Sequence, residues 1–420
     1  NLTSALESTN GELVVVFDAD HIPSQDFLAR TVGYFEDLDL FLVQTPHQFI
    51  NSDPIHRNLQ LPDHCPTESE MFYGHVLESL DRWNGVFFCG SAAILRRTAL
   101  DSIGGISGLT ITEDAETALD LHAMKWKSLY LNEAMVAGLQ PETFSTLITQ
   151  RKRWATGMVQ ISLLKNPFFR HGLTVHQRFC YLSSIMNWFF PLTRLTFTLA
   201  PLLYLFFGIN FFQASFEDAL IYSVTYAAAS LMTQNVLFKH VRWPLISEVY
   251  EIAQAPYLIR SFFSTLMSPK KAQFSVTAKD EVTNEDNLSA IHWPLTSLML
   301  VCFAGVIALV FRWFNYPETR GVLSVVGVWT IFNFIIVSAA WQAIFEKKNL
   351  RRSPRVSIDT SAKVFLPTQK SVSGIAAKIT DASRFGFKVT ILDSQVNTLN
   401  QSLSEGETLI HVMPEFDNAR

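Results

Sequence analysis

The first 170 residues combine short apolar runs with longer segments whose apolar residues recur every three or four positions. Residues 13–17 form an unbroken apolar run rich in valine, which is typical of a buried parallel strand. Residues 41–43 and 86–88 are further candidate strands. Residues 115–126 have the spacing of a helix with one apolar face, formed by Ala115, Ala118, Leu119 and His122. We therefore predict an α/β domain over residues 1–170.

The chain changes character at about residue 185, where long apolar segments begin. Four of them are long and apolar enough to span a bilayer: residues 185–208, 219–238, 294–314 and 322–344. Residues 245–267 differ, because Glu248, Glu251, Gln254 and Arg260 recur in them at helical spacing. We predict an amphipathic interfacial helix there, with a fifth span as the alternative. The membrane region is expected over residues 171–346.

Positive charges are concentrated in two of the loops between these segments. Lys239, Arg242, Lys270 and Lys271 follow the second segment, and Lys347, Lys348, Arg351 and Arg352 follow the fourth. The loops after the first and third segments carry Glu217, Asp218 and Glu318. Because loops rich in lysine and arginine stay in the cytoplasm, the N-terminal domain, the middle loop and the C-terminal segment are all predicted to be cytoplasmic.

The composition supports a mixture of soluble and membrane parts. Apolar residues make up 48% of the chain, which contains 34 phenylalanines. The net charge of -5 gives no reason to expect a nucleic-acid partner. The 4 cysteines form no CxxC pair, which argues against a zinc site and a disulfide framework. After residue 347, short alternating runs separated by turn residues predict a small β-barrel.

Asp18, Asp20 and His21 follow directly after the first predicted strand. Ligands of open α/β sheets bind beyond the carboxyl ends of the strands. Two carboxylates there can hold a divalent cation against a diphosphate, and His21 is a candidate nitrogen ligand. The alternative is a solvated turn, and the preceding strand favours the metal site.

Thr112, Glu113 and Asp114 precede the predicted helix 115–126. A carboxylate in this place could accept a proton from an attacking hydroxyl group. Threonine and aspartate are also common helix caps. These residues alone leave both interpretations open.

Gln150, Arg153 and Trp154 are spaced so that they share one face of a helix. Arginine can pair with phosphate through two hydrogen bonds, and tryptophan can stack on the apolar face of a sugar. An interfacial helix with its tryptophan among lipid headgroups is the alternative. Both interpretations can hold together.

The three motifs, in this order and followed by apolar segments, resemble the DxD, TED and QxxRW motifs of processive family 2 glycosyltransferases. The resemblance to bacterial cellulose synthase catalytic subunits extends to three further segments. Phe87, Phe88, Cys89 and Gly90 resemble the FFCG segment at the acceptor end, and the segment that ends at His47 resembles QTPH near the donor. Phe274, Val276, Thr277, Ala278 and Lys279 resemble the FxVTAK gating loop, expected within residues 270–285.

Residues 347–420 resemble a PilZ domain, possibly truncated, which binds cyclic-di-GMP. An RxxxR motif is formed by Arg351 and Arg355, with Arg352 between them, and a DxSxxG motif by Asp381, Ser383 and Gly386. Paired arginines suit phosphates and stack on guanine. On its own, the arginine cluster is equally well explained as a stop-transfer signal.

The resemblance implies a GT-A-like glycosyltransferase domain, α-helical transmembrane region and PilZ barrel. It implies transfer of glucose from UDP-glucose to a growing β-1,4-glucan, with release of UDP and export through the membrane. Asp18, Asp20 and His21 would hold Mg²⁺ or Mn²⁺, and Asp114 would be the general base. Gln150, Arg153 and Trp154 would position pyrophosphate and acceptor, and Trp188, Phe189 and Phe190 are candidates for the glucan path, with ordinary packing as the alternative.

Regulation and partners follow from the same resemblance. Arg351 would form a salt bridge with Glu142 that cyclic-di-GMP releases. The expected setting is the bacterial inner membrane, with a periplasmic, membrane-anchored cellulose synthase subunit as partner. Part of the donor site and several spans are expected upstream of Asn1. Another processive β-glycan synthase and a catalytically silent cyclic-di-GMP receptor are the alternative functions.

Overall fold

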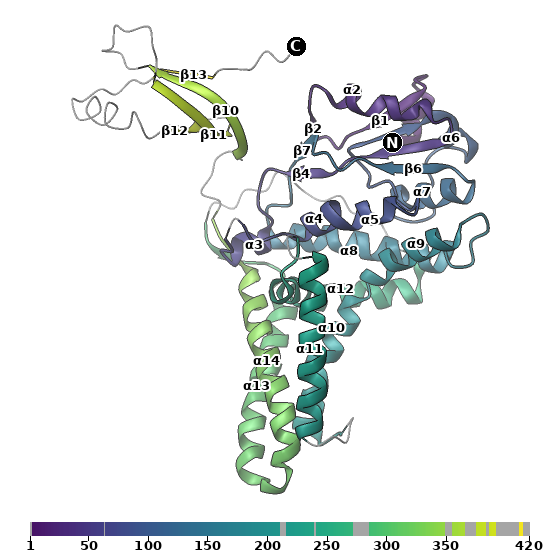
Figure 1. Cartoon of the computed structure of the whole chain (residues 1–420). Coiled ribbons are helices and arrows are strands. Elements are labelled where there is room, and N and C mark those ends of the chain that lie inside the picture. The colour runs from purple at the N-terminus through teal and green to yellow at the C-terminus, as the bar shows by residue number, and fades with distance from the viewer. Residues whose placement is uncertain are drawn as a thin grey trace. The chain divides into compact units, whose positions relative to one another are not determined.

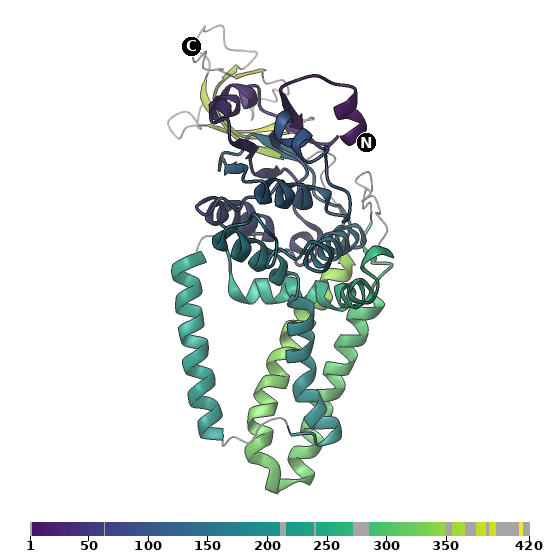
Figure 2. The same cartoon turned by 90° about the vertical axis from the view of Figure 1, so that its right-hand side faces the viewer.

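The computed structural model describes residues 2–62, 64–210, 216–238, 241–271, 285–348, 355–365, 375–383, 386–391 and 411–414. The chain forms two compact units, Asn1–Lys348 and Asn349–Arg420. The first contains an α/β part, from which long helices extend in one direction (Figures 1 and 2). The second is a small β unit and is described by itself.

The α/β part is built on a mixed sheet with the strand order β1-β5-β3-β6. Its strands are β1 (Leu13–Val16), β5 (Ala93–Arg96), β3 (Leu40–Gln44) and β6 (Lys127–Tyr130). Only β3 and β6 run parallel, whereas β5 is antiparallel to both of its neighbours. A second sheet contains β2 (Ile22–Pro23), β7 (Val136–Gly138) and β4 (His47–Phe49).

Short helices connect and cover these strands. They are α1 (Leu2–Glu7), α2 (Phe27–Thr31), η1 (Val32–Glu36), α3 (Pro54–Asn58), α4 (Glu68–Met71), η2 (Phe72–Val76), α5 (Leu77–Asp81) and α6 (Arg97–Ser102). Helix α7 (Glu113–Ala123) confirms the predicted helix, although it ends three residues earlier than predicted. Its buried residues include Ala115, Ala118, Leu119 and His122, the four predicted to form its apolar face.

Two strand predictions were wrong. Strand β1 was predicted to be a buried parallel strand, but among the described strands it pairs only with β5, and antiparallel. Val15 of this strand is 38% exposed. The prediction was wrong because an apolar run does not determine which strand will be its neighbour, or in which direction that neighbour runs. Residues 86–88 are buried but do not form a strand. The strand predicted at residues 41–43 is confirmed as β3, which is buried along its whole length.

The α/β part continues into α8 (Phe144–Gln160), η3 (Ile161–Lys165) and α9 (Val175–Asn187). Among the described residues, three stretches are long and apolar enough to cross a membrane: α10 (Phe190–Phe207), α13 (Trp293–Asn315) and the stretch Pro317–Ile344. The last contains η5 (Pro317–Thr319), α14 (Arg320–Trp341) and η6 (Gln342–Ile344). They correspond to three of the four predicted segments.

The remaining predicted span forms the helix α11 (Phe216–Phe238), which is not among these three stretches. The first predicted span began too early, because residues 185–187 belong to α9 and the chain turns before α10. Pro191 stands in the first turn of α10, where proline is tolerated because no helical N–H bond is lost.

Helix α12 (Pro244–Met267) runs across the ends of the long helices (Figure 2). It is the predicted amphipathic helix, but part of its polar face contacts protein. Glu248 and Glu251 form ion pairs with Arg194 of α10, and Gln254 donates to Glu68. Helix α12 contacts α8 on one side and α10, α13 and α14 on the other. It therefore joins the α/β part to the long helices. Short elements η4 (Pro269–Lys271), β8 (Asn287–Leu288) and β9 (Phe345–Glu346) complete the first unit.

One apolar core continues from the α/β part into the long helices. It contains Ile55 of α3 and Phe144, Leu147 and Ile148 of α8. The same cluster includes residues of α10, α12, α13 and α14. The start of α8 therefore packs on the same buried surface as the helices that could cross the membrane.

The described residues of the second unit form a four-stranded antiparallel sheet with the order β12-β11-β10-β13. Its strands are β10 (Arg355–Phe365), β11 (Ile375–Ser383), β12 (Gly386–Ile391) and β13 (His411–Pro414). The predicted β structure is confirmed. Closure of the sheet into a PilZ barrel stays a prediction.

Candidate active site

The Asp18–His21 segment lies directly after β1, as the sequence predicted. Asp18, Asp20 and His21 each offer a ligand atom, and these atoms all lie within 4.8 Å of one another. The loop is held by Ser91, whose Oγ accepts a hydrogen bond from the Asp18 N–H at 2.8 Å and contacts His21 Nδ1 at 2.6 Å. Asp20 Oδ2 accepts a bond from the N–H of Leu139 at 3.3 Å. Two carboxylates and an imidazole this close together fit a divalent cation.

His21 is fixed by packing as well as by hydrogen bonding. Its ring meets that of His47 edge to face, with the centroids 4.9 Å apart. A Cβ at Gly138 would lie 2.1 Å from Cδ2 of His21, so only glycine leaves room for the ring. His47 is in turn bonded to the Tyr73 hydroxyl at 2.8 Å and to the Ser91 carbonyl at 2.9 Å. His47 and the Asp18–His21 segment are therefore parts of one site.

Gln44 joins the QTPH and FFCG segments. Its side-chain oxygen accepts a bond from the N–H of Cys89 at 3.0 Å, and its amide donates to the carbonyls of Thr45, Ser91 and Ala92. Residues 86–88 are buried and belong to no described strand, and the residue that follows them, Cys89, is bonded to the Gln44 side chain. This explains the wrong strand prediction, since Phe87 and Phe88 are buried apolar residues in either case.

Asp114 lies at the start of α7 and faces the turn at Gly90. Gly90 has a φ of +82°, and a Cβ there would lie 3.1 Å from Asp114 Oδ2. Burial and the neighbouring charge of Glu113 raise the pKa of Asp114 to about 7, whereas the nearby Arg153 opposes the rise. A carboxyl group with this pKa is suited to take up a proton at neutral pH.

Helix α8 carries Gln150, Arg153 and Trp154, and the charge of Arg153 is close enough to act on the pKa of Asp114. Gly157 of this helix packs on Thr112, and a Cβ at Gly157 would lie 2.3 Å from its Cγ2. Gln160 accepts a bond from the N–H of Ile111 at 2.9 Å. These contacts fix the TED segment against the QxxRW helix. Thr112 stands at the N-cap position of α7, but its side chain makes no capping hydrogen bond. Asp114 Oδ1 accepts a bond from the N–H of Ala115 at 2.8 Å.

Trp154 is held by its own aromatic surroundings. The Arg151 guanidinium lies over its ring at 5.1 Å and pairs with Glu68 at 2.7 Å. The Trp188 ring packs against it edge to face at 6.3 Å, and Phe189 packs against Phe262 at 4.8 Å. Trp188, one of the candidates for the glucan path, therefore lies next to the tryptophan of the QxxRW motif.

Sequence reasoning missed several residues of the site. Ser91, Tyr73, Gly138 and Glu68 hold the motif residues in place but belong to none of the motifs. Ser91 follows the FFCG segment directly, which is the one available signal. Tyr73 and Gly138 reach the site through the fold alone.

The predicted regulatory residues are only partly described. Residues 274–279, Arg351 and Arg352 lie outside the described residues. In the second unit, the strand register places Arg355 opposite Ser383 and Ser383 opposite Gly386, while Asp381 stands opposite Ser357. In the first unit, Glu142 pairs with Arg57 at 2.8 Å. Its predicted bridge to Arg351 stays a prediction.

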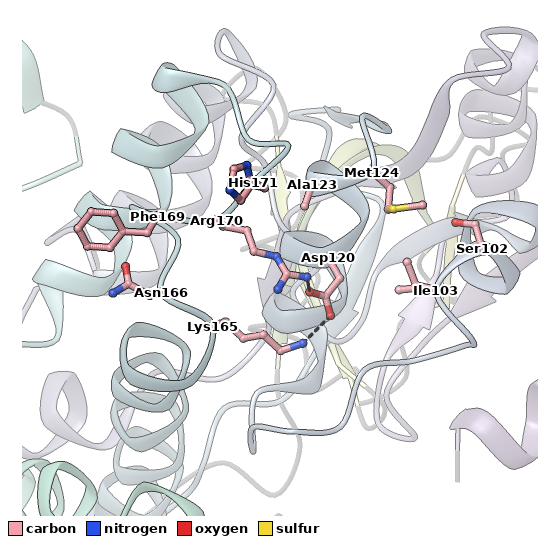
Figure 3. Close-up of a pocket in the computed structure, with 10 residues that line it drawn as sticks. All are labelled: Ser102, Ile103, Asp120, Ala123, Met124, Lys165, Asn166, Phe169, Arg170 and His171. Carbon is pink, nitrogen blue, oxygen red and sulfur yellow. Dashed lines mark hydrogen bonds and ion pairs between the residues drawn. The ribbon is translucent and has the colours of Figure 1, made fainter.

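A separate cavity of about 720 Å³ lies at the C-terminal end of α7. Its lining includes Asp120, which forms 2.8 Å ion pairs with both Lys165 and Arg170 (Figure 3). The ten residues drawn in Figure 3 include none of the motif residues. This cavity is therefore not part of the candidate active site.

The family assignment comes from comparison with known proteins. The model of glycosyl transferase family group 2 matches residues 13–238, which include all three motifs. The chain belongs to glycosyl transferase family group 2. The matched residues include the Asp18–His21 segment, Asp114 and the QxxRW residues of α8.

Curated relatives of this group 2 chain are bacterial cellulose synthases. It is 36% identical over 417 residues to the cellulose synthase catalytic subunit [UDP-forming] of Pseudomonas fluorescens (strain SBW25), covering 97% of this chain and 54% of the relative. It is 35% identical over 385 residues to the cellulose synthase 1 catalytic subunit [UDP-forming] of Komagataeibacter xylinus, covering 90% and 52%. The chain thus spans about half the length of these two relatives.

Solved structures resemble this group 2 chain only distantly. A mannosyltransferase from Pyrobaculum calidifontis in complex with GDP-Man and Mn²⁺ is 17% identical, with a TM-score of 0.36 over 64% of this chain and 66% of that one. S. aureus TarS is 10% identical, with a TM-score of 0.30 over 99% and 63%. The assignment rests on the sequence family and not on these structures.

Proposed function

We propose that this chain is the catalytic part of a processive, inverting glycosyltransferase that makes β-1,4-glucan from UDP-glucose at the bacterial inner membrane. The observation that supports this most is the position of Asp114, between the Gly90 turn and helix α8, with its pKa raised to about 7. A poised base beside a positioning helix is what attack by a sugar hydroxyl needs. The curated relatives supply the sugar class by analogy.

In the proposed reaction Asp114 takes the proton of the C4 hydroxyl of the terminal glucose. The freed oxygen attacks C1 of the donor glucose from the face opposite UDP, the bond from C1 to the diphosphate oxygen breaks, and UDP leaves. Asp18, Asp20 and His21 would hold Mg²⁺ or Mn²⁺, which would neutralise charge on the diphosphate. Burial and, after it, the charge of Glu113 raise the pKa of Asp114 to about 7, so that the base is half ionised near neutral pH.

Helix α8 would position the two substrates. Gln150 and Arg153 lie on the face of α8 predicted to meet pyrophosphate and acceptor, and Trp154 is a stacking surface already held by Arg151 and Trp188. His47, Phe87, Phe88, Cys89 and Gly90 would line the donor and acceptor end. Export of the product would follow a path beginning at Trp188, towards α10.

Control by cyclic-di-GMP is the regulatory part of the proposal. The nucleotide would bind to Arg351, Arg352, Arg355, Asp381, Ser383 and Gly386. Binding would take Arg351 away from Glu142, so the ligand would have different contacts in the two states. In the full-length protein, Arg351→Ala should give activity without the nucleotide, and unchanged strict dependence would count against this mechanism.

The test is incorporation of radiolabelled UDP-glucose by the full-length protein in membrane vesicles, followed by digestion with linkage-specific glucanases. Label released by an endo-β-1,4-glucanase supports the proposal. Incorporation into a polymer that resists this enzyme indicates another processive β-glycan synthase. Nucleotide binding without any incorporation indicates a silent receptor for cyclic-di-GMP. In both of the last two cases the proposal of cellulose synthesis fails.

A further inference from the structure

Glu346 lies two residues after the stretch Pro317–Ile344, which could cross a membrane, and belongs to none of the motifs. It is the second residue of β9, and it is only 4% exposed. Burial raises the pKa of its carboxyl group, and the hydrogen bonds it accepts oppose the rise. A buried carboxylate has to be matched by donors, since leaving it unpaired is costly.

The donors come from two distant parts of the chain. The Phe144 N–H donates to Glu346 Oε1 at 2.8 Å, and the Asn58 side-chain amide donates to Oε2 at 3.2 Å. The Arg57 guanidinium lies 3.9 Å from Oε2 and also pairs with Glu142. Glu346 therefore joins the end of the last long helix to α3 and α8.

Phe144 is the first residue of α8, so this contact is made at a helix end. The first N–H groups of a helix have no partner within the helix, and the helix dipole favours a carboxylate there. Thr143 and Thr146 form a capping box that satisfies the N–H groups of both residues. The capping box provides no acceptor for the N–H of Phe144, and Glu346 is that acceptor.

Glu346 itself is held in a fixed frame. Strand β9 pairs with β8, with Glu346 opposite Asn287, and the Ser289 N–H donates to the Ile344 carbonyl at 2.8 Å. Asn58 also donates to the Ala343 carbonyl at 2.7 Å and accepts from the Lys347 N–H at 3.0 Å. The carboxylate is thus a rigid anchor rather than a flexible surface group.

We infer that Glu346 is a positioning residue of the transferase, whose carboxylate fixes the first turn of α8 and thereby the places of Gln150, Arg153 and Trp154. This inference rests on the proposed function. Helix α8 is 17 residues long, and its other end is held by the contact of Gly157 with Thr112. Releasing the first end lets the substrate-positioning face shift relative to Asp114. A small shift of this kind lowers the rate strongly, because transfer depends on the alignment of the reacting groups.

Three substitutions in the full-length protein separate this role from simple loss of a buried charge. Glu346→Ala removes the acceptor of the Phe144 N–H. Glu346→Gln keeps an oxygen for that N–H but places an amide against the Asn58 donor. Asn58→Ala removes the bond to Glu346 together with the bonds to Ala343 and Lys347, and leaves Glu346 with Phe144. Glu133→Gln is the matched control, because Glu133 also pairs with an arginine, Arg30, but is 44% exposed.

We expect Glu346→Ala to lower kcat for glucose incorporation about tenfold or more, because the released first turn of α8 lets the substrate-positioning face shift relative to Asp114. We expect Glu346→Gln and Asn58→Ala to lose less than about threefold, and Glu133→Gln to lose nothing measurable. Equal losses for Glu346→Gln and Glu346→Ala would overturn the inference. If Glu346→Ala does not fold, Glu346→Asp replaces it, because its shorter side chain withdraws from Phe144. The inference then fails if Glu346→Asp is at least as active as Glu346→Gln.

A second measurement does not depend on the reaction. Hydrogen exchange at the amides of residues 144–147 reports whether the first turn of α8 stays closed. We expect faster exchange there in Glu346→Ala but not in Glu133→Gln, with unchanged exchange in β3. Unchanged exchange in the first turn of α8 overturns the inference. If the wild-type protein incorporates no sugar at all, the proposed function fails and this measurement still decides whether Glu346 holds α8.

Discussion

The rate of glucose transfer should depend on the ionisation of Asp114. This carboxyl group has its pKa raised to about 7 by burial and by the Glu113 charge. A general base works only in its ionised form, so activity should rise with pH rather than fall. The ionised fraction of a group with this pKa grows from about one tenth at pH 6 to about nine tenths at pH 8. The kcat/KM, which reports the ionisation of the free enzyme, should therefore rise about tenfold over this range.

Two substitutions test whether Asp114 is the group responsible. Asp114→Asn cannot accept the proton and should lower kcat by about 10²–10⁴-fold, the usual contribution of a general base. UDP should still bind, because Asp18, Asp20 and His21 lie on a different loop. Glu113→Gln removes the charge that helps to raise the pKa of Asp114, so the midpoint of the pH profile should move to lower pH.

The assay is initial-rate incorporation of radiolabelled glucose between pH 5.5 and pH 8.5, together with UDP binding measured by calorimetry. Asp101→Asn is a suitable control, because Asp101 is an exposed aspartate of the same α/β part. Full activity of Asp114→Asn would refute the assignment. A profile that falls as pH rises, or one that Glu113→Gln does not move, would refute the account of how the base is poised.

Three further predictions concern the metal site, the Gly90 turn and a buried histidine. Asp20→Asn should weaken Mn²⁺ binding about tenfold or more, measured by titration in the presence of UDP, because one of two carboxylates is lost. Gly90→Ala should lower kcat about tenfold, because the new Cβ would lie 3.1 Å from the carboxylate of Asp114 and Gly90 has a φ of +82°, which favours glycine. Gly33→Ala is the control and should leave kcat unchanged, because its Cβ would meet no atom within 4 Å. His122 donates or accepts bonds with Tyr181 and Ser128, and burial lowers its pKa to about 3. Below pH 6.5 the unfolded chain therefore binds a proton at His122 that the folded chain does not bind. His122 should lower the free energy of unfolding by about 2 kcal/mol when the pH falls from 7.5 to 5. In His122→Gln, the melting temperature should fall less over this pH range than it does in the wild-type protein.

The sequence predicted the motifs because each has a local pattern, but it did not predict what holds them. Asp18, Asp114 and Arg153 were found from their spacing and from the strands and helices beside them. Ser91 and Gly138 were missed, since their role depends on segments that are distant in the sequence. The strand predicted at residues 86–88 was wrong, because three apolar residues are buried there without belonging to a described strand.

The membrane region shows a similar limit. Apolar segments predicted where long helices occur, because hydrophobic length is a property of the local sequence. Hydrophobic length alone could not separate α9 from α10, because the two helices follow one another in one apolar run, with a turn at Trp188 and Phe189. Glu346 also gave no signal, since a single glutamate after a span is common on a protein surface. Its importance comes from the N–H of Phe144, which the fold brings to it.

In the proposed enzyme, the shared apolar core of α3, α8, α10, α12, α13 and α14 links the site of sugar addition to the helices that could cross the membrane. Phe144, Leu147 and Ile148 at the start of α8 are packed into the same cluster as these long helices. A change in the tilt of the helices would therefore reach α8 directly. A thicker or thinner bilayer changes the tilt of its helices. We therefore expect the rate of polymer growth to depend on the fatty-acid composition of the membrane, because bilayer thickness would act on the enzyme as an effector does.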